Sequence, residues 1–296
     1  MDALLATAAA PPARSTAAPR TRRADPWSTA AALAVLAVVV GLAVAAGAWH
    51  ASGGRWFVVD TPSMGRAAPV GTLVVTGPTT VAGTAVGDVV SFRPALDPGV
   101  VYTHRVAEVG AEGLRTSGDS TGAVDPWTVT DADLVGRAVV LAPGLGWLLR
   151  AVPPLALGGL ALWGLGTCVR DRARRASLRL LGGTVLVAAT AAVQRPLVGA
   201  EVLSTTVVDG TPTSLVVGTG LAPVRVAVQA TGGDVVDLVS GAVGRLALPA
   251  SGARTQIVTS LHLDGPAAAV LALVCALPLL WVLVVGLPGR APQEAR

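Results

Sequence analysis

The sequence is poor in charged and aromatic residues, and it contains no lysine. Of its 296 residues, 14% are charged, 3% are aromatic and 52% are hydrophobic, with a mean hydropathy of +0.64. An ordinary soluble domain carries about 25% charged residues, so we expect a membrane protein, or one with a large membrane part. The absence of lysine also excludes any mechanism that needs a lysine base, including a Ser-Lys dyad.

Histidine and cysteine are scarce as well. The three histidines, His50, His104 and His262, stand far apart, and Cys168 and Cys275 lie inside apolar runs. This spacing provides neither a zinc constellation nor a disulfide framework, so we expect no metal and no cofactor. The isoelectric point near 10.3 comes from arginines beside the apolar runs rather than from a basic patch with aromatic residues. We therefore expect no nucleic-acid binding.

Long apolar runs are the strongest feature that is present. Residues 30–49, 151–169 and 267–287 each form a run of roughly 20 apolar residues, the length that a helix needs to cross a bilayer. The shorter run 180–193 is flanked by arginines that could reach both interfaces, so it is a further candidate span. The first run is longer than the roughly 7–15 apolar residues of a signal peptide, which favours an uncleaved anchor.

The runs predict an alternation of membrane helices and polar segments. In order, we expect a disordered cytoplasmic tail (1–27), transmembrane helix 1 (28–50), a polar domain (51–144), transmembrane helix 2 (145–169), a basic cytoplasmic loop (170–179), transmembrane helix 3 (180–194), a second polar domain (195–265), transmembrane helix 4 (266–287) and a cytoplasmic tail (288–296). Arginines cluster in the first tail and in the basic loop, which the positive-inside rule places in the cytoplasm. We therefore expect a multi-pass protein of the plasma membrane with both polar domains outside the cytoplasm.

Both polar domains have the pattern of β structure, because short β-branched runs alternate with Gly, Pro and Asp. The expected strands are 56–59, 72–76, 88–92, 100–109 and 134–141 in the first domain, and 201–208, 214–217, 224–228, 245–248 and 255–263 in the second. The predicted fold class is therefore an α+β membrane protein. Its mostly-β first domain and a second small β domain are anchored by transmembrane helices.

Ser63 is the candidate nucleophile, because it follows the first apolar run closely and a histidine is available to activate it. A serine hydroxyl needs an adjacent base. His50 lies at the membrane edge and His262 lies in the other β domain, whereas His104 lies in an alternating strand on the same face as Tyr102. His104 is therefore the candidate base.

A carboxylate usually orients such a histidine, and the loop 117–127 offers two, Asp119 and Asp125. The sequence leaves the choice between them open. Donors for an oxyanion would come from the backbone N–H of Ser63 and from the hydroxyl of Thr61, since the Pro62 nitrogen has no hydrogen.

Taken in order, these segments resemble the sequence boxes of type I signal peptidases, in the branch of the endoplasmic reticulum, archaea and some Gram-positive bacteria that uses Ser-His-Asp. Residues 63–74 resemble the nucleophile box, 86–93 the Val-Gly-Asp-Ile-Val strand, 102–106 the Thr-His-Arg-Val box, 116–120 and 125–127 the Gly-Asp-x-Asn and Asp-Pro-Trp elements, and 134–138 the closing Val-Ile-Gly-Lys strand. The resemblance covers residues 28 to about 170.

The resemblance implies a membrane-bound serine endopeptidase that cleaves signal peptides from secretory preproteins, after small residues and at the outer face of the membrane. It implies that Ser63 attacks, that His104 acts as base and then as acid, and that Asp119 or Asp125 orients His104. Thr61 falls where the family often has a hydroxyl near the oxyanion. The implied partners are secretory preproteins and the lipid bilayer, with export-machinery or surface-assembly proteins as further candidates.

The alternative is a catalytically degenerate relative that binds a partner or acts as a scaffold in export or surface assembly. Two features keep this alternative open. Arg66 and Ala67 replace the Pro-Thr pair of the family's nucleophile box. The domain 195–265 is an addition that carries no catalytic constellation of its own.

Overall fold

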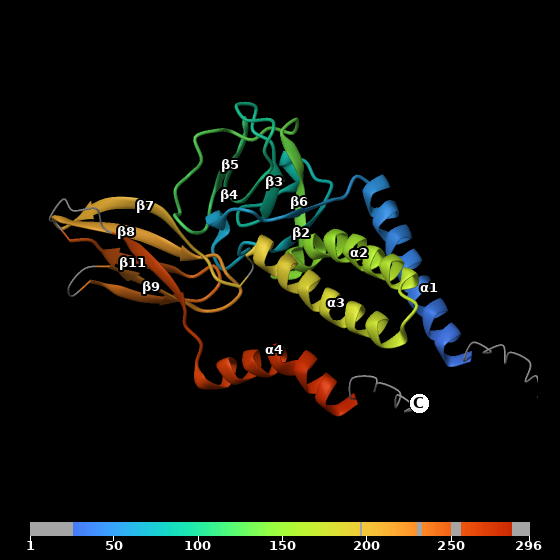
Figure 1. The fold of residues 1–296 in the computed structure, drawn as a ribbon. Coiled ribbons are helices and arrows are strands. Elements are labelled where there is room, and N and C mark those ends of the chain that lie inside the picture. The colour runs from blue at the N-terminus through green and yellow to red at the C-terminus, as the bar shows by residue number, and fades with distance from the viewer. Residues whose placement is uncertain (1–25, 196, 230–232, 250–255, 286–296) are drawn as a thin grey trace, which may run out of the picture. The chain divides into compact units, whose positions relative to one another are not determined.

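The computed structural model describes residues 26–195, 197–229, 233–249 and 256–285 (Figure 1). The chain is a mixed α+β protein built mostly of β-sheets, with helices before, between and after the sheet-forming segments in the sequence. It divides into two compact units, residues 1–49 and 50–296, and each is described by itself. The expected tail 288–296 and most of the expected disordered tail 1–27 lie outside the described residues.

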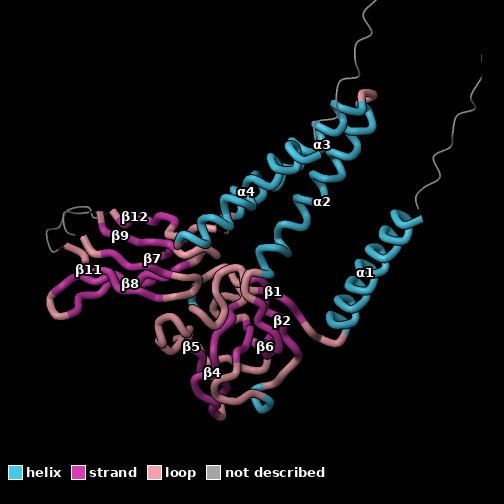
Figure 2. Tube along the Cα trace, turned by 90° about the horizontal axis from the view of Figure 1, so that it is seen from below, coloured by secondary structure: helices cyan, strands magenta, loops and turns pink. Residues whose placement is uncertain are grey.

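The first polar domain, called here the N-terminal β region, folds into a six-stranded antiparallel sheet, several strands of which are labelled in Figure 2. The strand order is β1-β2-β6-β3-β4-β5. Its elements are β1 (Arg55–Val58), η1 (Pro62–Met64), β2 (Leu73–Gly77), η2 (Val81–Gly83), β3 (Val89–Phe92), β4 (Tyr102–Gly110), β5 (Gly113–Ser117) and β6 (Leu134–Ala142). The sequence missed β5, which is a short strand between glycine- and serine-containing turns.

Strand β3 lies at the centre of this sheet and is buried on both faces. Successive side chains of a strand point to opposite faces, so Val89 packs beside Met64 while Val90 and Phe92 pack beside Leu114 on the other face. The segment around Met64 thus packs on one face of the sheet, and the strand that carries His104 pairs directly with β3.

The second polar domain, called here the C-terminal β region, contains two three-stranded antiparallel sheets, β10-β9-β12 and β11-β8-β7. Its strands are β7 (Ala200–Val208), β8 (Thr211–Gly218), β9 (Val224–Val228), β10 (Val235–Leu238), β11 (Val243–Ala247) and β12 (Ile257–Leu261). One apolar cluster joins the sheets, with Val216 of β8, Val226 of β9 and Leu246 of β11 all fully or almost fully buried. Strand β10 was not predicted from the sequence.

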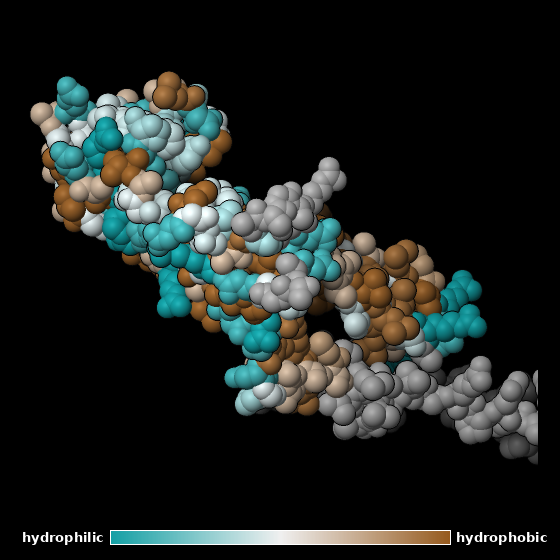
Figure 3. All heavy atoms as spheres, turned by 90° about the vertical axis from the view of Figure 1, so that its left-hand side faces the viewer, coloured by the Kyte–Doolittle hydropathy of each residue, from teal (hydrophilic) through white to brown (hydrophobic). Residues whose placement is uncertain are grey.

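The helices are α1 (Pro26–Ala51), α2 (Leu145–Cys168), α3 (Arg172–Gln194) and α4 (Gly265–Val285). Among the described residues, two stretches are long and apolar enough to cross a membrane, Leu145–Cys168 and Arg174–Gln194. Their apolar side chains are exposed; Leu157, for example, is 70% exposed and Val185 is 67% exposed. Figure 3 shows hydrophobic residues gathered densely in one part of the surface, with hydrophilic and mixed residues elsewhere.

Helix α3 differs from the expected span 180–194, because it begins at Arg172. Most of the basic segment expected as a loop at 170–179 is therefore helical. Arginine and alanine are good helix formers, and residues 172–181 contain neither glycine nor proline, so nothing in this stretch ends a helix. The longer helix removes the difficulty that the apolar run 180–193 alone is short for a bilayer.

Candidate active site

Ser63 is presented by a single helical turn that follows the first strand. The turn η1 holds Ser63 half-buried between Pro62 and Met64, which are both buried. Gly65 ends the turn with φ +52°, a conformation that favours glycine, and its N–H donates to the Pro62 carbonyl at 3.0 Å. The buried Met64 side chain anchors the turn, so the adjacent Ser63 hydroxyl faces outward from a fixed position.

The loop 118–120 holds the same turn from the other side. The Ser120 N–H donates to the Ser63 carbonyl at 2.9 Å, and the Ser120 hydroxyl donates to the Pro62 carbonyl. Gly118 packs so closely that a Cβ there would lie 2.8 Å from the Ser63 carbonyl oxygen. A side chain at position 118 would therefore push the serine turn away.

His104 lies on β4 opposite Val90 and is only 7% exposed. Its Nδ1 lies 2.7 Å from Asp125 Oδ2. An ionised carboxylate only accepts hydrogen bonds, so a neutral imidazole in this contact carries its proton on Nδ1 and has Nε2 as an acceptor. The ring also packs against Phe92 and Tyr102, with centroid distances of 6.3 and 6.0 Å. Both contacts fix the orientation of the imidazole.

Asp125 is itself held by two groups of Thr116. The Thr116 hydroxyl donates to Asp125 Oδ2 at 2.5 Å, and the Asp125 N–H donates to the Thr116 carbonyl at 2.8 Å. Thr116 is fully buried and Asp125 is 9% exposed, so water does not compete for these bonds. Thr116 was missed from the sequence, although its position two residues before Gly118 in a strand-forming segment is a weak signal.

The other candidate carboxylate, Asp119, points elsewhere. It forms a two-pronged pair with Arg105, with distances of 2.9 Å from Nε and 2.6 Å from Nη2. This hydrogen bonding raises the pKa of Arg105 above its ordinary value. Arg105 also donates to the Gly87 carbonyl at 2.8 Å. The structure thus brings Asp125 to His104 and leaves Asp119 as a partner of Arg105.

The register of the sheet explains this division. His104 and Arg105 are consecutive in β4, so their side chains point to opposite faces. Arg105 pairs with Ser117 of β5, and the chain that continues from Ser117 brings Asp119 to the Arg105 side. A bridge between Ser117 and Val124 then returns the chain, which places Asp125 on the His104 side.

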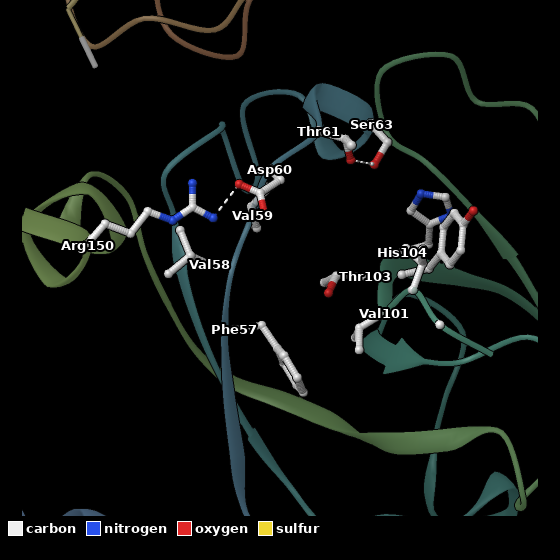
Figure 4. Close-up of a pocket in the computed structure, with 13 residues that line it drawn as sticks. Phe57, Val58, Val59, Asp60, Thr61, Ser63, Val101, Thr103, His104 and Arg150 are labelled. Atoms are coloured by element: carbon white, nitrogen blue, oxygen red, sulfur yellow. Dashed lines mark hydrogen bonds and ion pairs between the residues drawn. The ribbon is translucent and has the colours of Figure 1, made fainter. Parts of the chain in front are cut away.

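Ser63 and His104 both line a cleft of about 560 Å³ (Figure 4). One wall of the cleft comes from the end of β1 and the residues after it, the other from the start of β4, and Arg150 of α2 closes one end by pairing with Asp60. The structure has no hydrogen bond between Ser63 and His104. Substrate-free active sites often have longer contacts that shorten when substrate binds.

Thr61, whose hydroxyl we expect from the sequence to donate to an oxyanion, lies next to Ser63. Its Oγ1 is 3.5 Å from Ser63 Oγ, and Figure 4 shows the two hydroxyls facing each other. The backbone N–H of Ser63 is the second expected donor. Among the described residues, no group of three or more His, Cys, Asp or Glu side chains is arranged to hold a metal ion.

Comparisons of the chain with protein-family models, with curated proteins and with solved structures found no match. A buried Thr116-Asp125-His104 chain that ends at a cleft shared with a half-exposed serine is an arrangement suited to nucleophilic acyl transfer.

Proposed function

We propose that this chain is a membrane-bound serine endopeptidase of the signal peptidase I type, which cleaves signal peptides from secretory preproteins at the outer face of the membrane. The observation that carries the proposal is the 2.7 Å contact between His104 Nδ1 and Asp125 at the edge of the cleft that Ser63 also lines. The substrate class rests on the resemblance of residues 28 to about 170 to that family.

The residues have complementary roles in the proposed reaction. The Ser63 hydroxyl attacks the scissile carbonyl while His104 Nε2 accepts its proton, which His104 then gives to the leaving amine. Asp125 stabilises the imidazolium through Nδ1. The Ser63 N–H and the Thr61 hydroxyl donate to the oxyanion. A water molecule then hydrolyses the acyl-enzyme by the same steps, so the reaction needs no cofactor.

The cleft and the helices also fit this substrate class. Phe57, Val59 and Val101 give the cleft apolar walls, which suit the small side chains before a signal-peptide cut. Strand β1 is an edge strand that pairs only with β2 among the described strands, so its free edge can add an extended peptide. Helices α2 and α3 are long and apolar enough to hold the site beside a membrane.

The test is cleavage of a preprotein with an Ala-x-Ala site by the full-length protein in detergent. We expect Ser63→Ala and His104→Ala each to lower the rate by about 10³-fold or more, because the triad acts as a unit. Ser260→Ala and His50→Ala are matched controls, since both residues are exposed and lie outside the cleft. A wild type that does not cut, or a Ser63→Ala variant that cuts equally well, would refute the proposal and favour the partner-binding alternative.

A further inference from the structure

A second cavity begins where the first cleft ends. It has a volume of about 380 Å³ and shares Thr61, Ser63 and His104 with the cleft, but its other lining residues differ. One side is formed by the loop 118–126 of the N-terminal β region. The opposite side is formed by Glu201 and Leu203 of strand β7. The C-terminal β region therefore contributes side chains directly beside the nucleophile.

The backbone also packs closely between the two β regions at this place. Gly241, at the turn before β11, lies against Gly65 at the end of the serine turn, and a Cβ on Gly241 would be 2.4 Å from the Gly65 carbonyl oxygen. Only a residue without a side chain permits this approach. This contact brings the turn before β11 against the turn that presents Ser63.

Strand β7 has two features of a binding element. It is the edge strand of the sheet β11-β8-β7, and on its other side no described strand pairs with it. Its pairing with β8 shifts between Val202 and Ser204, so Leu203 is the extra residue of a bulge. Bulges occur next to active sites and redirect side chains. Here the bulged Leu203 lines the cavity beside Ser63.

The carboxylates that line this cavity are Glu201 and Asp125. Glu201 is exposed, and its side chain takes part in no hydrogen bond or ion pair with the described residues. The other carboxylate of the cavity, Asp125, is already bound by His104 and Thr116. The cavity lining contains no arginine. A cationic group that enters the cavity would therefore find Glu201 available as its partner.

We propose that β7 forms the wall that binds the substrate residues following the cut, and that Glu201 selects preproteins with a basic residue there. This inference rests on the proposed function, in which the cleft between β1 and β4 takes the residues before the cut. The cavity on the other side of Ser63 is then the place for the first residues of the mature protein. Leu203 contacts their backbone or apolar side chains, and Glu201 pairs with a Lys or Arg.

The experiment uses three preproteins that differ only in the second and third residues after an Ala-x-Ala site. Both positions are Lys in the first preprotein, Gln in the second and Glu in the third. For the wild type we expect kcat/KM to rise about threefold from Gln to Lys and to fall by a similar factor for Glu, as a partly exposed ion pair gives. The effect should appear mainly in KM, because the pair forms equally in the ground and transition states. Salt at about 0.5 M should reduce the difference in KM between the three preproteins, because salt screens the ion pair.

Variants of Glu201 distinguish this pairing from a general charge effect. Glu201→Gln should bring the three rates close together, and Glu201→Arg should reverse their order. Glu112→Arg is the matched control, because Glu112 lies at the β4–β5 turn and lines neither cavity around Ser63. It should keep the wild-type order.

The outcomes separate the two proposals. If the wild type cuts none of the three preproteins, the proposed function fails. If it cuts all three and Ser63→Ala cuts none, but the rates ignore charge or Glu201→Arg keeps the wild-type order, the proposed function stands and the role of Glu201 is wrong.

Discussion

At the scale of single residues, two aspartates of one loop have different surroundings. Asp125 is buried and contacts His104, whereas Asp119 is part of a more exposed pair with Arg105. A carboxylate that orients an imidazole acts on the chemical step, while a carboxylate in a surface ion pair acts on stability and by a small amount. The two aspartates should therefore respond differently to the same substitution.

We expect Asp125→Asn to lower kcat by about 10³ to 10⁴-fold, because an amide no longer selects the histidine tautomer that accepts the serine proton. Asp119→Asn is the matched control, and it should change kcat only a few-fold. Steady-state kinetics with the Ala-x-Ala preprotein measures both. A loss of only a few-fold for Asp125→Asn would show that the proposed reaction does not depend on the His104–Asp125 contact.

At the scale of the elements, helices α2 and α3 pack through glycines that face leucines. A Cβ at Gly158 of α2 would lie 2.5 Å from Leu186 Cδ1 of α3, and a Cβ at Gly182 of α3 would lie 2.5 Å from Leu162 Cδ2 of α2. Small residues allow helices to approach closely, which is a main source of helix association in membranes. Gly159, next to Gly158, has no atom within 4 Å of its Cβ position.

We expect Gly158→Val to destabilise the protein by about 1–3 kcal/mol, because the added methyl groups overfill the contact with Leu186. Gly159→Val makes the same change in the same helix but points into open space. Thermal unfolding in detergent should therefore show a lower Tm for Gly158→Val than for Gly159→Val. Equal Tm values would mean that this contact does not contribute to stability.

Strands β9 and β10 are joined by an ion pair that depends on pH. Arg225 donates two hydrogen bonds of 2.7 Å to Asp237, and these bonds lower the pKa of Asp237 below its ordinary value. His262 Nε2 also lies 3.5 Å from this carboxylate. Because the folded state favours the ionised form, the pair stabilises the protein above the ordinary carboxyl pKa, and this contribution is lost as the pH falls through the lowered pKa.

We therefore expect Asp237→Asn to have a slightly lower Tm than the wild type at about pH 6, with the difference shrinking as the pH falls below about 4. Asp209→Asn is the control, since the Asp209 side chain makes no ion pair with the described residues. It should show no such pH-dependent difference. A gap for Asp237→Asn that stays constant with pH would contradict the ion-pair explanation.

At the scale of the whole molecule, the proposal requires both β regions to lie on one side of the membrane and the α2–α3 turn on the other. Helices α2 and α3 are consecutive, and residues 170–179, which include part of the turn between them and the start of α3, contain five arginines. Positive charge near membrane helices favours the cytoplasmic side. The two β regions, with more acidic than basic residues, are suited to the outside.

Labelling of single cysteines in intact cells tests this orientation. Cys168 and Cys275 are both free, so a Cys168→Ala, Cys275→Ala background serves as the starting point. A membrane-impermeant maleimide should label Ala82→Cys and Thr211→Cys but not Arg170→Cys, and all three should be labelled after the cells are opened. Labelling at position 170 alone would place Ser63 in the cytoplasm and refute the proposed function.

The sequence by itself determined the features that depend on local composition. The apolar runs predict the helices, and alternating β-branched runs predict most of the strands. Because the chain has no lysine, and because His50 and His262 lie outside the first β domain's strands, the sequence leaves His104 as the candidate base for Ser63. The short strands β5 and β10 were missed, because β5 contains a single β-branched residue, Thr116, and β10 combines two valines with Asp237 and Leu238, so neither is an alternating β-branched run.

Only the tertiary structure decided which groups meet. Strand register places Asp125 rather than Asp119 at His104, and a buried threonine of β5 holds that aspartate. A bulge in β7 places Leu203, together with Glu201, at a cavity beside Ser63, although more than 130 residues separate them along the chain. The physical reason is that composition and periodicity report what each segment does locally. Pairing register, bulges and close glycine contacts are set by packing between distant segments.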